Sequence, residues 1–103
     1  MNIIESDEDF YKFIGRQKPV IVIFSTHTCH TCVGVEEKIK NSFKDIEKAK
    51  VYLDDLPLLR GQLGIFNVPV VSIYFDSQET AKFIRVFSID NIKSKINRLL
   101  EFV

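Results

Sequence analysis

The sequence predicts an α/β fold in which helices cover both faces of one mixed β-sheet. Three observations indicate it: strand-like and helix-like stretches alternate along the chain, the run at 20–24 is apolar without alternation, and a short polar turn separates two strand-like stretches near the end. Strands separated by helices are typical of parallel crossovers, and a hairpin adds antiparallel strands. The expected order is β-α-β-α-β-α-β-β-α.

The first three elements lie before residue 25. Residues 2–4 form a short strand. Ser6 is a good N-cap for a helix with Asp9 in its first turn, and Gly15 is a natural end for that helix. Residues 20–24 are rich in β-branched side chains and do not alternate with polar ones, so we expect both faces of this strand to be buried.

A long helix, a short strand and a short helix follow. The long helix runs from about residue 29 to about residue 47, with apolar side chains at helical spacing. Residues 51–53 form the strand. Asp54 and Asp55 then cap a short helix over 57–63, which has a proline in its first turn. The apolar positions of the long helix are Val35, Ile39, Phe43 and Ile46.

The C-terminal part of the sequence predicts a hairpin and a last helix. Residues 70–75 are an apolar strand, 76–78 a tight polar turn, and roughly 81–87 the returning strand. Ser88 is an N-cap candidate. The inner face of the last helix consists of Ile89, Ile92, Ile96, Leu99 and Val103.

The composition is that of one ordinary globular domain, residues 1–103. The chain is 46% hydrophobic and 27% charged, and 14 basic residues balance 14 acidic ones. This length is too short for two separate cores. A net charge of zero creates no field that attracts nucleic acid or an anionic membrane, so we expect neither as a partner. The sequence shows no signal-peptide pattern and no apolar run that could span a bilayer, so we expect a cytoplasmic location.

The only two cysteines lie together in the segment Cys29-His30-Thr31-Cys32. In a reducing compartment, two close cysteines indicate redox chemistry or a metal site. The pair follows a buried strand and begins a helix, where unpaired N–H groups and partial positive charge stabilise a thiolate. The spacing exposes Cys29 at the helix tip and shields Cys32 beneath it, so that one cysteine attacks and the other resolves the mixed disulfide.

A metal site is the competing interpretation, because His27, Cys29, His30 and Cys32 are close in the sequence. Zinc requires a tetrahedral set of ligands, and four ligands packed into the start of a helix cannot easily surround one ion. We therefore expect no metal in the single chain. A site shared by two chains through the cysteines stays open.

Pro69 adds a second indication of the same chemistry. Proline is unexpected at the start of a central strand, and a cis bond between Val68 and Pro69 explains it. With this residue the sequence resembles the thioredoxin superfamily over essentially the whole chain, in the apolar strand, the cysteine motif, the segment 63–70 and the hairpin after it. The resemblance implies that Cys29 is the nucleophile and Cys32 the resolving cysteine. It also implies that Pro69 lies beside the disulfide and that the backbone of Val68 pairs with the substrate chain.

The sequence departs from the thioredoxin pattern at four places. Thr28 stands where the family has Trp, and it is our candidate substrate contact at that position. His30 and Thr31 stand between the cysteines in place of Gly-Pro. Ile23 replaces a buried acid, and Phe87 replaces a Gly in the substrate groove. The cysteine chemistry therefore carries over, whereas the groove and the proton relay do not. We expect His30 and Thr31 to tune the redox equilibrium, since an imidazolium beside the first cysteine favours its thiolate and makes the disulfide more oxidising.

These features predict an enzyme that exchanges its Cys29–Cys32 dithiol or disulfide with protein substrates, acting as a reductase. Its reductant would be a thioredoxin reductase or a low-molecular-weight thiol. We expect no cofactor besides the redox-active cysteine pair, and we expect the protein to be a monomer. The alternative is a thioredoxin-fold binding or redox-sensing module with little turnover, which the missing Trp, acid and Gly favour. Most phenylalanines, Phe66 among them, are expected in the core. The other interpretation for Phe66, and for Phe87, is contact with substrates near the redox face.

Overall fold

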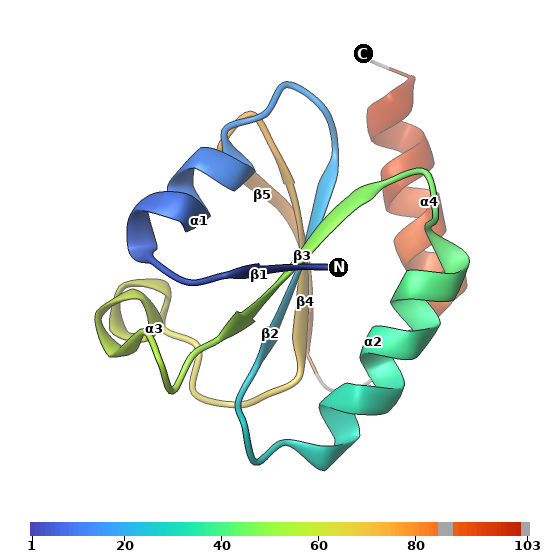
Figure 1. The fold of residues 1–103 in the computed structure, drawn as a ribbon. Helices are drawn as coiled ribbons and strands as arrows, with labels where there is room; N and C mark the ends of the chain where they lie inside the picture. Colours follow the sequence, from blue (N-terminus) through green and yellow to red (C-terminus); the bar gives the residue numbers. More distant parts are fainter. Residues whose placement is uncertain (85–87, 102–103) are drawn as a thin grey trace.

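The computed structural model describes residues 1–84 and 88–101, and in these residues two layers of helices enclose a five-stranded sheet (Figure 1). α1 and α3 lie on one face of the sheet and α2 and α4 on the other. This arrangement confirms the predicted fold class and order; Phe87 and Val103, the predicted ends of the last strand and helix, lie outside the described residues. The elements are β1 (Asn2–Ile4), α1 (Asp7–Ile14), β2 (Val20–Ser25), α2 (His30–Ser42), β3 (Glu47–Tyr52), α3 (Pro57–Leu63), β4 (Val70–Phe75), β5 (Gln78–Ile84) and α4 (Ile89–Leu100).

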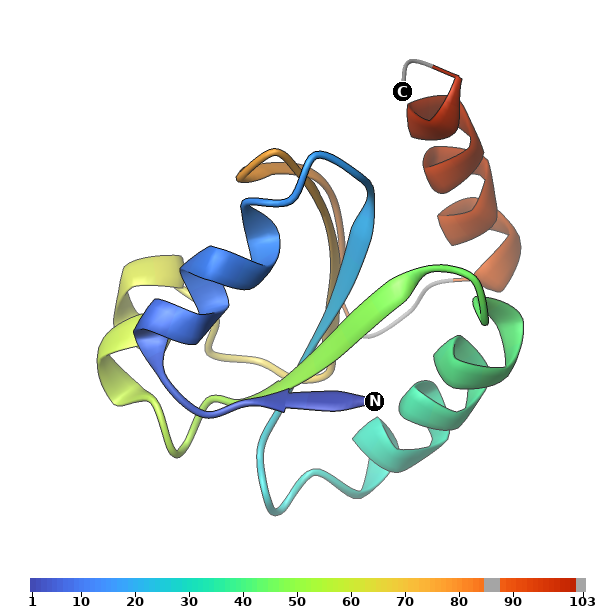
Figure 2. The ribbon, with the colours of Figure 1, turned by 45° about the horizontal axis from the view of Figure 1, so that its top comes forward.

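The strands are ordered β1-β3-β2-β4-β5 in the sheet. β3 is parallel to both β1 and β2, β4 is antiparallel to β2, and β5 is antiparallel to β4. Figure 2 shows β1 at one edge and the β4–β5 hairpin behind β2. Phe24 near the end of β2 is the register partner of Val70 at the start of β4. The chain that leaves β2 therefore lies next to the chain that enters β4.

β2 buries both of its faces, as its continuous apolar run predicts. Val20, Val22 and Phe24 belong to the core cluster under α1 and α3. Ile21 and Ile23 belong to the cluster under α2 and α4. All five side chains are fully buried, so β2 is the most enclosed support for the segment that follows it.

Several element boundaries follow from local signals that the sequence carries. The Ser6 hydroxyl accepts a hydrogen bond from the N–H of Asp9 at 3.0 Å, and the Ser88 hydroxyl accepts one from the N–H of Asn91 at 3.1 Å. Both serines are therefore the N-caps that were predicted. The turn between β4 and β5 is tighter than expected: Asp76 and Ser77 both have positive φ, and β5 begins at once, before the predicted start near residue 81.

The predicted end of α2 near Glu47 was wrong, because the helix ends at Ser42. Phe43 caps it and buries its ring in the core. The Lys48 ammonium donates to the carbonyl oxygens of Phe43 at 2.6 Å and Ile46 at 2.9 Å, which satisfies two carbonyl groups of the chain that leaves the helix. Ile46 packs on the same core from the loop, so the helical spacing of apolar residues continues beyond the helix itself.

The predicted caps of α3, Asp54 and Asp55, were also wrong. α3 begins at Pro57 with Leu56 as its N-cap and has no side-chain cap. Its end agrees with the prediction, since it stops at Leu63. Gly64 follows in the left-handed conformation with φ of 67°, which a residue with a side chain rarely adopts.

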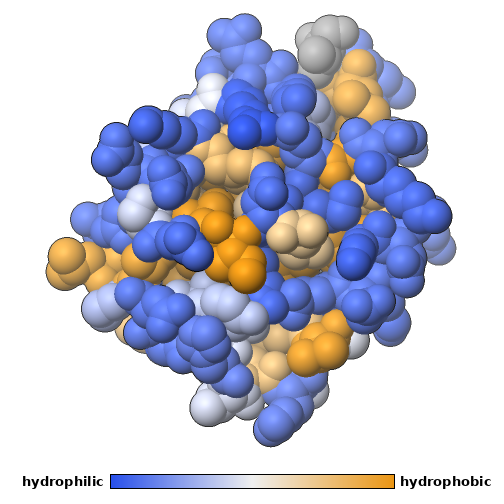
Figure 3. Space-filling view, viewed as in Figure 1, coloured by the Kyte–Doolittle hydropathy of each residue, from blue (hydrophilic) through white to orange (hydrophobic). Residues whose placement is uncertain are grey.

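The surface is mostly hydrophilic on the face seen in Figure 3, where apolar residues show as separate groups. The large apolar side chains that are most exposed among the described residues are Leu58 in α3 and Phe66 in the loop before β4. Within residues 1–84 and 88–101, no helix combines the length and the apolar character needed to cross a bilayer.

Candidate active site

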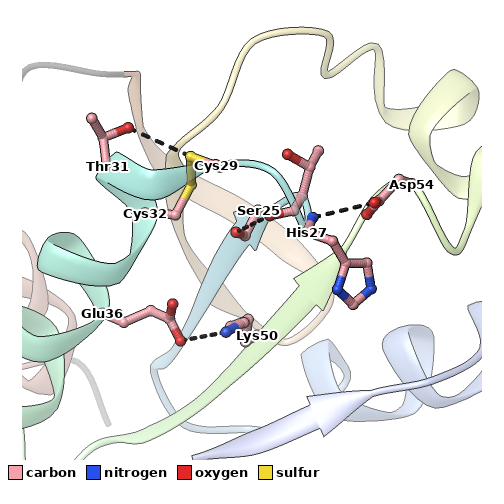
Figure 4. The surroundings of a disulfide bond; sticks show 9 residues. Ser25, His27, Cys29, Thr31, Cys32, Glu36, Lys50 and Asp54 are labelled. Atoms are coloured by element: carbon pink, nitrogen blue, oxygen red, sulfur yellow. Dashed lines mark hydrogen bonds and ion pairs between the residues drawn. A yellow bond between two sulfur atoms is a disulfide. The ribbon is translucent and has the colours of Figure 1, made fainter.

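Cys29 and Cys32 form a disulfide where β2 passes into α2 (Figure 4). Cys29 is the N-cap of α2, and its N–H donates to the carbonyl oxygen of Thr26 at 3.2 Å. Cys32, in the first turn, is 1% exposed, whereas Cys29 is partly exposed. Cys29 is thus the more accessible of the two cysteines.

The start of α2 creates a positive electrostatic environment for the cysteine pair. The first N–H groups of a helix have no acceptor within the helix, and the macrodipole places about half a positive charge there. The first turn of α2 has no acidic side chain to oppose this field. A thiolate at Cys29 would be stabilised by both effects, which lower the pKa of cysteine thiols at helix N-termini.

The polar residues of the cysteine motif differ in their contacts. The Thr31 hydroxyl lies 3.5 Å from Sγ of Cys29 (Figure 4). His30 is the first residue of α2 and is exposed, and Thr28 is exposed on the loop just before the disulfide. Of the two predicted tuning residues, Thr31 is therefore the one with a direct contact to the sulfur.

Val68 and Pro69 enter the site from β4. The bond between them is cis, Pro69 is buried, and Val68 is partly exposed. They immediately precede Val70, the register partner of Phe24. The start of β4 therefore lies next to the end of β2, where the segment with the disulfide begins. Phe66 lies in the same loop and is 68% exposed, so the prediction that it belongs to the core was wrong. Its contact with substrates stays a prediction.

His27, just ahead of the disulfide, contacts three residues of the neighbouring loop and strand. Its Nε2 lies 2.8 Å from a carboxylate oxygen of Asp55, and its backbone N–H donates to Asp54 at 3.2 Å. Its ring stacks on Tyr52 with centroids 3.9 Å apart. The hydrogen bond to Asp55 raises the pKa of His27 above its ordinary value of 6.5. His27 therefore ties the loop that carries Cys29 to the end of β3.

Asp55→Asn is expected to lower the pKa of His27, because the variant loses the charge and weakens the hydrogen bond that raise it. Since the folded-state pKa is raised, protonated His27 stabilises the fold below the unfolded pKa of 6.5, and this contribution is lost as the pH rises through the folded-state pKa. A magnetic-resonance titration of the imidazole protons measures the shift, with His30 as reference in the same spectrum. An unchanged His27 titration would contradict the assignment of this contact.

A half-buried ion pair lies on the sheet face beneath Cys32 (Figure 4). Nζ of Lys50 in β3 is 2.7 Å from Oε1 of Glu36 in α2. Lys50 also lies over the ring of Tyr52, 4.4 Å from its centroid. Burial alone would lower the pKa of Lys50, but its hydrogen bonds to Glu36 and Tyr52 outweigh this and raise the pKa. No local pattern in the sequence indicates this pair, because its two residues are brought together only by the packing of α2 on β3.

Comparison with known proteins places this geometry in a family. The family model described as Thioredoxin matches residues 2–98. The chain belongs to the thioredoxin family. The thioredoxin-like protein YdfQ of Bacillus subtilis is 23% identical over 90 residues, which cover 84% of this chain and 80% of that protein.

Solved thioredoxin structures share the fold at low sequence identity. A mutant thioredoxin from Halobacterium salinarum superposes with a TM-score of 0.86 at 17% identity, covering 99% of this chain and 92% of that one. Plasmodium falciparum thioredoxin gives 0.76 at 19% identity, with coverages of 95% and 98%. Together with the disulfide-bonded Cys29–Cys32 pair, the thioredoxin domain supports, in general terms, a thiol–disulfide oxidoreductase.

The departures from the thioredoxin pattern occupy distinct places in the fold. Thr28 leaves the position before the first cysteine without an aromatic ring. Ile23, in the position of the buried acid, is fully buried in β2 and packs among apolar residues. Phe87 lies outside the described residues. The proton relay of the family thus has no carboxylate on β2 in this chain.

Thr31→Val is expected to shift the dithiol–disulfide equilibrium toward the disulfide by about two- to tenfold, because a hydrogen bond to a charged, partly exposed sulfur is worth on the order of 1 kcal/mol. The thiolate of Cys29 would lose the hydroxyl that stabilises it, and the reduced form would become less stable. Equilibration in graded glutathione buffers, alkylation and mass measurement give the ratio. Thr28→Val, in the same motif, should leave the ratio unchanged, and an equal shift in both variants would argue against the Thr31 contact.

Proposed function

We propose that this thioredoxin-family protein is a protein-disulfide reductase that cycles its Cys29–Cys32 pair between dithiol and disulfide. The observation that carries the proposal is the asymmetry of the pair: Cys29 is partly exposed at the N-terminus of α2, and Cys32 is buried behind it. A thioredoxin reductase or a small thiol would regenerate the dithiol. The cytoplasmic location and the monomeric state stay predictions from the sequence.

The proposed reaction has two displacement steps. The Cys29 thiolate attacks one sulfur of a substrate disulfide, a bond forms between them, and the other substrate sulfur leaves as a thiolate. Cys32 then loses its proton and attacks Sγ of Cys29, which releases the second substrate thiolate and closes the Cys29–Cys32 disulfide. The substrate disulfide is reduced by two electrons, the cysteine pair is oxidised by two electrons, and both released thiolates take protons from solvent.

Substrate binding is proposed for the residues that flank the disulfide. Val68 precedes Pro69 just before the start of β4 and is partly exposed, so its backbone is a candidate to pair with an extended substrate chain. Thr28, the residue immediately before Cys29, is exposed. Phe66 offers an apolar side chain in the loop that leads to Val68.

Multiple turnover is the test of this function. The protein is incubated with a disulfide-containing test protein and excess dithiothreitol, and the free thiols of the test protein are labelled and counted by mass. We expect many test-protein disulfides to be reduced per molecule, and Cys29→Ser to fall to the rate of dithiothreitol alone. Reduction that persists in Cys29→Ser would disprove the proposal.

The direction of electron flow needs a separate measurement. Equilibration in graded thiol–disulfide buffers gives the reduction potential of the Cys29–Cys32 couple by alkylation and mass. We expect a value near that of thioredoxin, about −270 mV, for a reductase. A markedly higher reduction potential would indicate an oxidant or isomerase. It would also indicate that His30 makes the disulfide more oxidising.

A binding or redox-sensing module is the second candidate, and the apolar surroundings of Ile23 favour it. The acid that assists proton transfer in the family is absent from β2, where Ile23 is fully buried. Such a module would form the Cys29–Cys32 disulfide once, and its dithiol form would be regenerated slowly. Stoichiometric reduction of the test protein, without further turnover in excess dithiothreitol, would decide for this candidate.

A further inference from the structure

Glu36 lies on the same face of α2 as Cys32. The two residues are four apart in the helix His30–Ser42, a spacing that brings side chains to within about 6 Å at Cβ. Figure 4 shows the carboxyl group of Glu36 turned from the helix toward β3, beneath the disulfide. Its side chain is 20% exposed, whereas Cys32 is 1% exposed. The Glu36 carboxyl group is therefore more accessible to solvent than the shielded sulfur of Cys32.

Lys50 fixes this carboxylate against the sheet. Lys50 in β3 and Ile23 in β2 are register partners in parallel strands, so their side chains share the face covered by α2. The ammonium of Lys50 donates to Oε1 of Glu36 at 2.7 Å, which leaves Oε2 for another donor. The carboxylate that β2 lacks at Ile23 is thus supplied to the same space by α2.

We propose that Glu36, positioned by Lys50, accepts the proton of the Cys32 thiol in the resolving step. This inference rests on the proposed disulfide exchange. As the S–S bond from Cys32 to Cys29 forms and the bond from Cys29 to the substrate breaks, the proton of Cys32 passes to the Glu36 carboxylate, directly or through one water, and then to solvent. The electron pair of the broken bond stays on the substrate sulfur.

The surroundings of Cys32 explain why an acceptor is needed and why Glu36 is suited to the role. A buried thiol ionises poorly. Apart from Ser25, the side chains that β2 and β4 bury on this face are apolar: Ile21, Ile23, Val71 and Ile73. Besides Lys50, the titratable side chains in β3 and the loops beside it include Lys48, Tyr52, His27, Asp54 and Asp55. Lys48 donates to the carbonyl groups of Phe43 and Ile46, and Tyr52 stacks on His27. His27 binds the carboxylates of Asp54 and Asp55, whereas Glu36 is the carboxylate that α2 itself carries on the side of Cys32.

The test separates the two cysteine steps in one experiment. Reduced protein is mixed with dithiobis(nitrobenzoic acid) in a stopped-flow instrument, and the yellow thionitrobenzoate is followed. A first equivalent is released when Cys29 attacks the reagent, and a second when Cys32 resolves the mixed disulfide. The first phase depends on the reagent concentration and the second does not, so that each rate is measured independently.

Glu36→Gln is expected to slow the second phase about tenfold at pH 7 and to leave the first phase unchanged. The expected loss is smaller than that of a typical general base, because the Glu36 carboxylate also accepts the hydrogen bond of Lys50. At a pH high enough to ionise the buried Cys32 thiol, which lies above the free-thiol pKa of about 8.5, the loss should fall below about twofold, since the ionised thiol needs no acceptor. Glu37→Gln is the matched control, because Glu37 is the adjacent residue on α2 and is exposed.

The native protein provides a second readout that does not depend on how the variant folds. Its second phase should be nearly level from about pH 6 to 8, because the carboxylate takes the proton throughout this range. A native second phase that rises with thiol ionisation over the whole range overturns the role of Glu36, as do equal rates in the Glu36 and Glu37 variants. Release of only one equivalent by the native protein would instead refute the proposed two-cysteine exchange itself.

Discussion

Cys32→Ser is expected to turn the protein into a trap that holds its substrates through Cys29. The variant keeps the partly exposed Cys29 at the start of α2 and loses the buried sulfur that would displace the substrate. The mixed disulfide therefore forms but cannot resolve within the molecule. Without an added reductant, the substrate should remain bound as a covalent complex, and dithiothreitol should release it by attacking the mixed disulfide.

Two variants and one gel decide this prediction. Non-reducing electrophoresis after incubation with a disulfide-containing test protein should show the covalent complex for Cys32→Ser and none for Cys29→Ser. Mass measurement of the complex locates the bond. If Cys29→Ser formed the complex and Cys32→Ser did not, the roles of nucleophile and resolving cysteine would be reversed, contrary to the exposures of the two residues.

The features that the sequence predicted well are those with local signals. The run at 20–24 reads as a fully buried strand because no polar residue interrupts it, and Ser6 and Ser88 cap helices because an N-cap needs only its own next turn. The cysteine pair is equally local: a strand, a short loop and a helix place it without any distant contact. Fold order follows, because helices between strands leave few possible connections.

The features that the sequence did not predict depend on contacts between distant elements. Asp54 and Asp55 were interpreted as helix caps, but they lie at the end of β3, parallel to β2, so they meet His27 at the same edge of the sheet. Glu36 and Lys50 each look like solvated helix or strand residues on their own. Only the register that sets Lys50 beside Ile23 brings them beneath Cys32.

Phe10→Ala is expected to destabilise the fold strongly. Phe10 is fully buried between α1 and the sheet, and its ring packs against Phe24 and Tyr74 with centroids 6.0 and 5.8 Å apart. Removal of such a ring leaves a cavity and costs about 3–5 kcal/mol, a large part of the roughly 5–15 kcal/mol that stabilises a domain. Because the chain has no Trp, urea unfolding of the oxidised protein is best followed by far-ultraviolet circular dichroism.

Phe66→Ala is the matched control, since it removes the same ring from a side chain that is 68% exposed. Its free energy of unfolding should change by no more than about 0.5 kcal/mol, as at most surface positions. A cost similar to that of Phe10→Ala would mean that Phe66 packs against the fold in solution. With the fold intact, a loss of test-protein reduction in Phe66→Ala would then measure its contact with substrates, because the Cys29–Cys32 pair and its support in β2 remain unchanged.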